Sequence, residues 1–299
     1  MVASEDPRTL EERIQDLNTW RRGSERAPHK PLLLLLALGA FSRGQRSLSF
    51  PEVETGLGAL LKEFGPSRKA THPEYPFWRL QNDGLWVVTS ERPMRARQGN
   101  TDPPISELRA ANARGQLASD VLAELSARPR EVAQLAHQIL DDNFAETLHE
   151  DILEAVGLLT PASVVTSKRR RDPNFRNAVL VAYGYRCAMC GLDLRLGSVS
   201  VGLDAAHVKW HQASGPDSVN NGITLCTLHH KLLDLGAFTV GHDNRVLVSE
   251  HANGSKTAEE VLMRHHGATM SVPKRSDEHP HPEFLQWHRS EVFKERPLP

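Results

Sequence analysis

Apolar residues recur at the spacing of amphipathic helices through the first half of the chain. The apolar run at 32–41 predicts a buried helix. Ser49, followed by a proline two residues later, predicts the start of a helix that ends near Phe64. Further helices are predicted near 7–21, 105–114, 117–127, 130–142 and 148–157. Asp83-Gly84 lies between two apolar runs, which predicts a small β-hairpin.

The second half has a different pattern, in which short apolar strands alternate with polar loops. The order of elements between 201 and 235 is strand, loop, strand and helix, and 280–296 has the pattern of a helical tail. The segment 161–175 is polar and basic, with no periodicity, and is interpreted as a linker. The sequence therefore predicts an α+β protein with two domains, 1–160 and 176–299.

Composition narrows the function classes only a little. The 299 residues include 36 basic and 37 acidic side chains, which excludes a protein that is basic throughout but not one with a basic patch for nucleic acid. No apolar run reaches the ~20 residues that span a bilayer, so no membrane contact is expected. The N-terminus shows no secretory signal, and the odd number of cysteines argues against a disulfide framework. A reducing, cytoplasmic location is expected.

All three cysteines belong to two pairs with the same spacing. Cys187 and Cys190 form one pair, and Cys226 and His229 form the other. Two such pairs supply four soft ligands, which is the pattern of a closed, tetrahedral, structural Zn²⁺ site. Reduced, buried cysteines beside an unrelated histidine are the alternative reading.

A second set of polar residues is interleaved with the first. His207 ends the predicted strand, Asn221 follows fourteen residues later, and His230 comes nine residues after that. His229 and His230 are adjacent on a predicted helix, so their side chains point about 100° apart. The two histidines are therefore expected to serve different metals, with His230 facing the strand that carries His207.

Residues 176–240 resemble the HNH endonuclease family, which has a ββα-metal fold. The resemblance implies that His207 is the general base, that Asn221 orients the loop, and that His230 binds a catalytic Mg²⁺ or Mn²⁺. Many members place an aspartate directly before the catalytic histidine, where this chain has alanine. Asp204 is the candidate second ligand, with a backbone-bonded role as the alternative. His211 is interpreted as a surface residue, and Asp234 either orients His230 or ends the helix.

Several N-terminal side chains have the chemistry of DNA contacts. His29 and Lys30 directly precede a helix, whose N-terminus itself favours anions. Tyr75 and Pro76 offer apolar faces beside the guanidinium of Arg79. A loop without periodicity carries side chains that suit base edges in a major groove. These side chains are Arg95, Arg97, Gln98 and Asn100.

Together these pieces resemble the sulfur-binding domain of phosphorothioate-dependent, McrA-type (type IV) restriction endonucleases. The resemblance covers most of 20–160, and the order of the two domains matches as well. It implies duplex DNA in which sulfur replaces one non-bridging phosphate oxygen. Tyr75, Pro76 and Arg79 would form an apolar pocket for the soft sulfur, and His29 and Lys30 would hold the charge of the phosphate. The loop containing Arg95 would read the neighbouring bases.

Two other functions remain open on the sequence. The first is an HNH nuclease that reads a methylated base through an aromatic cage. The second is a zinc-stabilised DNA-binding protein without catalysis, although such a protein has no need of the histidine-asparagine-histidine set. One active site per chain suggests a homodimer for double-strand breaks, and separate modules suggest cuts at a distance from the modification.

Overall fold

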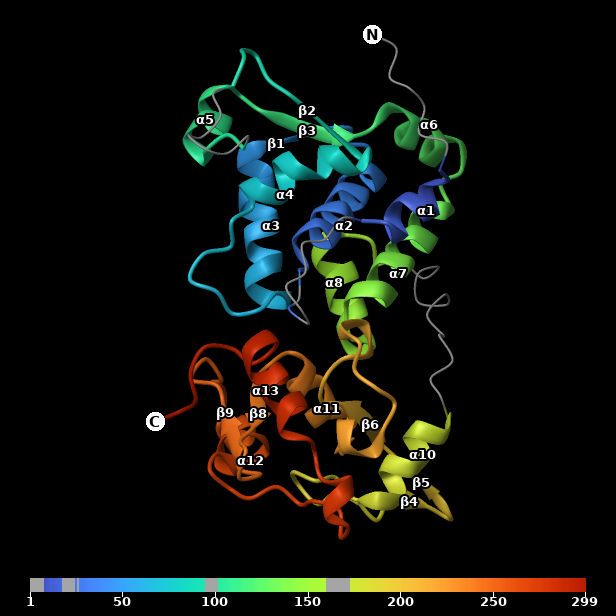
Figure 1. The fold of residues 1–299 in the computed structure, drawn as a ribbon, viewed down its shortest axis with the longest axis vertical. Helices are drawn as coiled ribbons and strands as arrows, with labels where there is room; N and C mark the ends of the chain where they lie inside the picture. The colour runs from blue at the N-terminus through green and yellow to red at the C-terminus, as the bar shows by residue number, and fades with distance from the viewer. Residues whose placement is uncertain (1–7, 18–24, 26, 95–101, 160–172) are drawn as a thin grey trace. The chain divides into compact units, whose positions relative to one another are not determined.

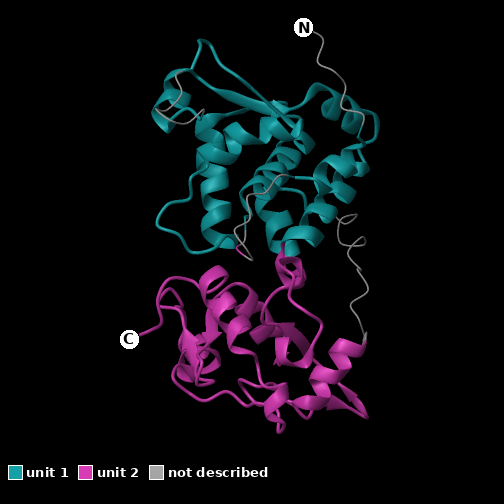
Figure 2. Ribbon diagram, in the orientation of Figure 1, with its two compact units in different colours: residues 1–22, 27–143, 149–168 teal, residues 23–26, 144–148, 169–299 magenta. Residues whose placement is uncertain are grey.

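The structure is a computed structural model that describes residues 8–17, 25, 27–94, 102–159 and 173–299 (Figure 1). Contacts divide the chain into two compact units, which Figure 2 colours separately. The N-terminal unit comprises 1–22, 27–143 and 149–168, and the C-terminal unit comprises 23–26, 144–148 and 169–299. No helix among the described residues has the length and apolar character that crossing a membrane requires.

The N-terminal unit is mainly helical and contains one small antiparallel sheet. Its helices are α1 (Leu10–Gln15), α2 (His29–Ser42), α3 (Phe50–Phe64), α4 (Glu74–Arg79), α5 (Ile105–Ala110), α6 (Ser119–Ala127), α7 (Glu131–Asn143) and α8 (His149–Val156), with the 3₁₀ turn η1 (Leu80–Asp83) after α4. Its strands β1 (Leu48–Ser49), β2 (Trp86–Thr89) and β3 (Arg114–Leu117) form a sheet in the order β1-β3-β2.

Helix α2 is the centre of this unit because it is apolar on every side. Leu32, Leu33 and Leu35 are fully buried, and α3, α4, α7 and α8 pack against the helix. Figure 1 shows these helices gathered around it. Helix α3 begins as predicted, because the Ser49 hydroxyl accepts from the Glu52 N–H and the Glu52 carboxylate accepts from the Ser49 N–H.

The predicted β-hairpin at Asp83-Gly84 is wrong. Residues before this turn form α4 and η1, and only the run after it is a strand, β2, which pairs with β3. Gly84 has the positive φ of 71° that such a turn requires, but it ends a 3₁₀ helix. The first helix is also shorter than predicted, because Thr9 caps it and α1 ends at Gln15.

The C-terminal unit contains three small antiparallel ribbons and short helices. The ribbons pair β4 (Arg195–Leu196) with β5 (Val199–Ser200), β6 (Leu203–His207) with β7 (Gly222–Cys226), and β8 (Phe238–Val240) with β9 (Val246–Val248). The helices are α10 (Pro173–Ala182), α11 (Thr227–Asp234), α12 (Lys256–Val261) and α13 (Pro282–Glu291). Short 3₁₀ turns are η2 (Glu146–Leu148), η3 (His211–Ala213), η4 (Val219–Asn221), η5 (Met263–His265) and η6 (Ser276–Glu278).

The elements β6, β7 and α11 follow the predicted order of strand, loop, strand and helix. In the ribbon, His207 lies opposite Gly222 and Leu203 lies opposite Cys226. Helix α10 packs against both strands, and α11 contacts both of them as well. The ribbon thus places His207 at one end and Cys226 at the other, and the first turn of α11, directly after Cys226, carries His229 and His230.

Candidate functional site

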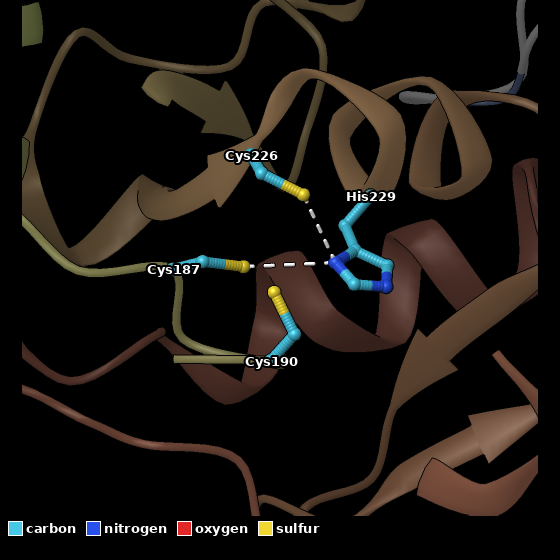
Figure 3. A group of neighbouring side chains, drawn as sticks. All are labelled: Cys187, Cys190, Cys226 and His229. Carbon is cyan, nitrogen blue, oxygen red and sulfur yellow. Dashed lines mark hydrogen bonds between the residues drawn. The ribbon is translucent and has the colours of Figure 1, made fainter. Parts of the chain in front are cut away.

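Three thiols and one imidazole form a compact cluster in the C-terminal unit. Cys187, Cys190, Cys226 and His229 each offer one ligand atom, and these atoms all lie within 4.8 Å of one another. Figure 3 shows the three sulfur atoms around the Nδ1 atom of His229. The cluster combines a loop after α10 with the last residue of β7 and the first turn of α11. The four residues that the spacing predicted are therefore brought together.

Hydrogen bonds orient the imidazole of His229 toward the sulfur atoms. Its Nδ1 lies 3.1 Å from the Cys226 sulfur and 3.6 Å from the Cys187 sulfur. Its Nε2 lies 3.0 Å from the carbonyl oxygen of Val261 and donates to it, which leaves the Nδ1 lone pair for the cluster. Hydrogen bonding from Cys226 and His229 lowers the pKa of the Cys187 thiol to about 3. This donor set of three sulfurs and one oriented nitrogen fits Zn²⁺.

The neighbouring His230 lies among carboxylates instead of thiols. Its Nδ1 is 3.5 Å from an oxygen of Asp204 on β6, and its Nε2 is 3.3 Å from an oxygen of Asp234 at the end of α11. The Nδ1 atom is buried and has no hydrogen-bond partner, so Asp204 lies close to it without forming a hydrogen bond with it. Asp234 also accepts a hydrogen bond from the hydroxyl of Thr147. The two adjacent histidines thus face different surroundings, as predicted.

Asp204 lies on the same face of β6 as Ala206, the position directly before His207 where many HNH endonucleases carry an aspartate. Side chains alternate along a strand, so Asp204 and Ala206 share a face while His207 lies on the other. Asp204 is partly exposed, with 28% of its side chain accessible. Its carboxylate and the open Nδ1 of His230 are suitable ligands for Mg²⁺ or Mn²⁺, which usually take one or two protein groups besides water and phosphate oxygens.

His207 is held on two sides by residues that the sequence analysis missed. Its Nε2 lies 2.8 Å from an oxygen of Asp217, and its ring stacks on Phe175 with centroids 4.2 Å apart. Burial lowers the pKa of His207, and the nearby Asp217 carboxylate opposes that shift. The imidazole is therefore neutral near pH 7, with its Nε2–H donated to Asp217.

Gly222 allows Phe175 to reach the histidine. A Cβ atom at Gly222 would lie 2.4 Å from Val179, closer than such atoms approach, and 3.1 Å from the Phe175 ring, tighter than most such contacts. Because Gly222 is the partner of His207 in the ribbon, helix α10 packs directly over the end of β6. Because Gly222 has no side chain, Phe175 can pack directly against the ring of His207.

Asn221 closes the loop between the two strands. It is fully buried, and its Oδ1 accepts from the Lys209 N–H at 2.9 Å. Its Nδ2 donates to the carbonyl oxygens of Lys209 at 3.0 Å and Pro216 at 2.9 Å. All of these contacts are with the backbone, so Asn221 fixes the loop that carries Asp217. His211 is exposed in η3, as expected for a surface residue.

In the N-terminal unit, the predicted DNA-binding cations are paired with buried carboxylates. Lys30, in the first turn of α2, donates to Asp83 at 2.6 Å, and only 4% of the Asp83 side chain is exposed. His29 is half-buried beside it, and burial lowers the pKa of His29. Both residues lie at the start of the apolar helix, as the sequence indicates.

Tyr75 and Arg79 lie on α4 with a histidine that the sequence analysis did not select. The Tyr75 ring stacks on His72 at 5.0 Å, and the Arg79 guanidinium lies over the Tyr75 ring at 4.8 Å. Arg79 also donates to Asp102 at 2.7 Å. Pro76, on the same helix, is buried. The predicted base-reading residues lie outside the described part of the chain; they are Arg95, Arg97, Gln98 and Asn100.

Comparisons with known proteins agree with this geometry. Residues 187–241 match the family model of an HNH endonuclease. That range contains the thiol cluster, Asp204, His207, Asn221 and His230. The C-terminal unit thus carries an HNH endonuclease domain.

The N-terminal unit identifies the family. Residues 7–160, just over half of the chain, match the model described as "ScoMcrA-like, DNA sulfur-binding domain". The chain therefore belongs to the family that carries this domain. A comparison with curated proteins gave no match.

Several solved structures resemble the chain, including the following three. The sulfur-binding domain of ScoMcrA complexed with phosphorothioated DNA is 27% identical over 51% of this chain and 97% of that one, with a TM-score of 0.47. The sulfur-binding domain of SprMcrA in a similar complex is 25% identical over 49% and 91%, with a TM-score of 0.41. The type IV phosphorothioation-dependent restriction endonuclease ScoMcrA is 26% identical over 51% and 33%, with a TM-score of 0.44.

Proposed function

We propose that this protein is a restriction endonuclease that recognises phosphorothioate-modified duplex DNA and hydrolyses phosphodiester bonds at its HNH site. The observation that carries the proposal is the joining of two modules in one chain. One belongs to a DNA sulfur-binding family, and the other places His207, Asn221 and His230 on one ββα unit. A purely DNA-binding protein has no need of the second set.

Recognition is assigned to the surface formed by Lys30, Tyr75 and Arg79, with His29 and Pro76 beside it. A sulfur atom is larger and more polarisable than oxygen and is less tightly hydrated, so it gains more from contact with a flat aromatic or aliphatic face. The stacked side chains of Tyr75 and Arg79 supply such flat faces, and the charged heads of Lys30 and Arg79 suit the anionic linkage. Arg95, Arg97, Gln98 and Asn100 are proposed to read the neighbouring bases.

His207 is proposed as the general base. Burial keeps its imidazole neutral near pH 7, and Asp217 occupies Nε2. The lone pair that accepts a proton from water is therefore on Nδ1. Phe175 restrains the plane of the ring, and Asn221 holds the loop from which Asp217 approaches. Asp217 is thus a positioning residue, since it acts through His207.

The catalytic Mg²⁺ or Mn²⁺ would be held by Asp204 and Nδ1 of His230. Bound there, the cation would stabilise charge on the phosphate and on the leaving oxygen. Asp234 faces the other nitrogen of His230, which is the usual arrangement of a carboxylate that orients a ligating histidine. The thiol cluster would hold a structural Zn²⁺ that ties the loop after α10 to β7 and α11. A homodimer would supply the two active sites that double-strand cleavage needs.

Paired duplexes test the proposal. One carries a single phosphorothioate of Rp configuration, and its twin is unmodified. Each is incubated with the full chain and Mn²⁺ or Mg²⁺, beside the His207→Ala variant. We expect cleavage of the modified duplex alone, lost in the variant. Equal cleavage of both duplexes would overturn the sulfur assignment, and binding without cleavage would overturn the nuclease. Mapping the ends then tests whether cuts fall at a distance from the modification.

A further inference from the structure

The surface proposed to contact sulfur includes a stack of three flat groups. The imidazole of His72 lies almost parallel to the Tyr75 ring, with 16° between their planes, and the Arg79 guanidinium lies over the same ring. About half of the His72 side chain is exposed, and 44% of the Arg79 side chain is exposed. A ligand can therefore reach the stack from solvent.

Each end of this stack is held by a buried carboxylate. Glu74 lies 3.2 Å from Nδ1 of His72, and only 2% of its side chain is exposed. Asp102 accepts from Nε of Arg79 at 2.7 Å and is 4% exposed. A buried carboxylate is costly unless it is paired, so these contacts restrict where the exposed heads can move.

The same arrangement recurs beneath Lys30. Asp83 is the third carboxylate that is buried within the described residues of the N-terminal unit, and it pairs with Lys30. All three buried carboxylates of that part of the chain therefore hold groups of the proposed binding surface. For a site that binds a polyanion this is unexpected on charge alone, because each carboxylate weakens the attraction for phosphate.

The backbone at His72 supports a functional reading. Its φ is +48°, a left-handed conformation that residues other than glycine adopt rarely. Such conformations persist where the surroundings over-determine them, and they gather at binding sites. Here the conformation brings the imidazole onto the Tyr75 ring.

We propose that His72 is a further sulfur-contacting residue, and that Glu74 and Asp102 are positioning residues that hold the His72–Tyr75–Arg79 stack. The inference rests on the proposed function. Held in this way, the stack presents polarisable faces to sulfur. The fixed guanidinium of Arg79 cannot move to form an ion pair with the oxygen of an unmodified phosphate. Discrimination then comes from the rigid faces rather than from the total positive charge.

The test measures binding by fluorescence anisotropy on the non-cleaving His207→Ala chain. The probes are the paired duplexes, each at several salt concentrations. Asp102→Asn and Glu74→Gln remove one charge each at nearly constant shape, and His72→Ala removes a face of the stack. Glu63→Gln is the matched control, because it removes an exposed carboxylate of the same unit on α3. Thermal unfolding confirms that each variant is folded.

For Asp102→Asn we expect tighter binding of the unmodified duplex. Its salt dependence should be steeper by about one phosphate contact, that is, a log–log slope larger by ~0.9. Binding of the phosphorothioate duplex should be equal or weaker, so the preference should fall by about tenfold. Glu74→Gln and His72→Ala should lower the preference in the same direction, through weaker binding of the modified duplex. Glu63→Gln should leave the preference unchanged.

An unchanged preference in folded Asp102→Asn and Glu74→Gln would overturn the positioning role. A parallel loss of affinity for both duplexes would do the same, because it would indicate a merely structural role. An unchanged preference in His72→Ala would overturn its contact with sulfur. If the parent chain shows no preference at all, the proposed function fails and this inference fails with it.

Discussion

His229 and His230 are neighbours on one helix, yet their surroundings have opposite chemistry. His229 lies among three sulfur atoms and is anchored by a backbone carbonyl, whereas His230 lies between two carboxylates. The turn of about 100° between adjacent helical residues is enough to separate them. Soft ligands suit a closed structural Zn²⁺ and hard ligands suit a cation that binds phosphate. A single helical turn can therefore serve stability on one side and chemistry on the other.

The strongest way to test the stability side is Cys226→Ser. Because structural zinc contributes on the order of 10 kcal/mol to the folding of small metal-dependent domains, we expect the C-terminal unit to lose its cooperative unfolding transition. Zinc should also fall below one per chain. Calorimetry and elemental analysis measure both, with the exposed neighbour Thr227→Ser as the control. Unchanged zinc content and unfolding temperature would contradict the structural site.

On the other side of the helix, His230→Ala should abolish cleavage while sparing the fold. We expect a loss of at least about a hundredfold in rate, since the proposed cation loses a ligand. Zinc content should stay at one per chain, whereas His229→Ala should lose it. Leu228→Ala, at a half-exposed position of the same turn, is the control for helix stability. Loss of zinc from His230→Ala would show that the two histidines share one site.

Asp234→Asn sharpens the comparison further, because it removes the carboxylate that faces Nε2 of His230 while an amide oxygen can still accept from Thr147. We expect the Mn²⁺ concentration for half-maximal cleavage to rise by about 10- to 100-fold, the usual cost of losing a carboxylate behind a ligating histidine. Zinc content should not change. The exposed Asp243→Asn is a matched charge control. A loss of zinc with no change in the Mn²⁺ concentration for half-maximal cleavage would contradict this role, because it would indicate that Asp234 orients His229 instead of His230.

The smallest expected effect concerns pH. Protonated His207 cannot accept a proton, so cleavage should fall as the pH drops through its pKa, which burial holds below the ordinary value of 6.5. Asp217 opposes that shift, so Asp217→Asn should move the acid limb to lower pH. The plateau rate should fall by about tenfold as the ring loses its partner. A pH profile of kcat/KM measures both, and a shift of the limb to higher pH would contradict the role.

The C-terminal site was more accessible to prediction than the N-terminal one. The thiol cluster and the opposed histidines depend on spacings of three residues and one residue, which the sequence displays directly. Phe175 and Asp217 were missed because no spacing links them to His207; the fold does. In the N-terminal unit, Lys30 and Asp83 are 53 residues apart, and Arg79 and Asp102 are 23 apart. Such pairs have no local signal.

The mistaken hairpin has a similar cause. Asp83-Gly84 correctly indicated a turn, but Phe77 and Leu80 before it are three residues apart and fully buried, which is helical spacing. Burial on one helical face therefore decided the structure before the turn. His72 carried no sequence signal at all, because its positive φ and its stacking are visible only in the folded chain.

The close packing at Gly222 has a consequence for protein engineering. The HNH family model begins at residue 187, yet Phe175 on α10 stacks on His207, and Val179 occupies the space that a side chain at Gly222 would need. A nuclease module cut at its first cysteine and fused to another DNA reader would leave that helix behind. The transplanted strand would then expose an apolar face, and its histidine would turn freely. The smallest nuclease fragment that can be transferred to another protein should therefore start at the beginning of α10.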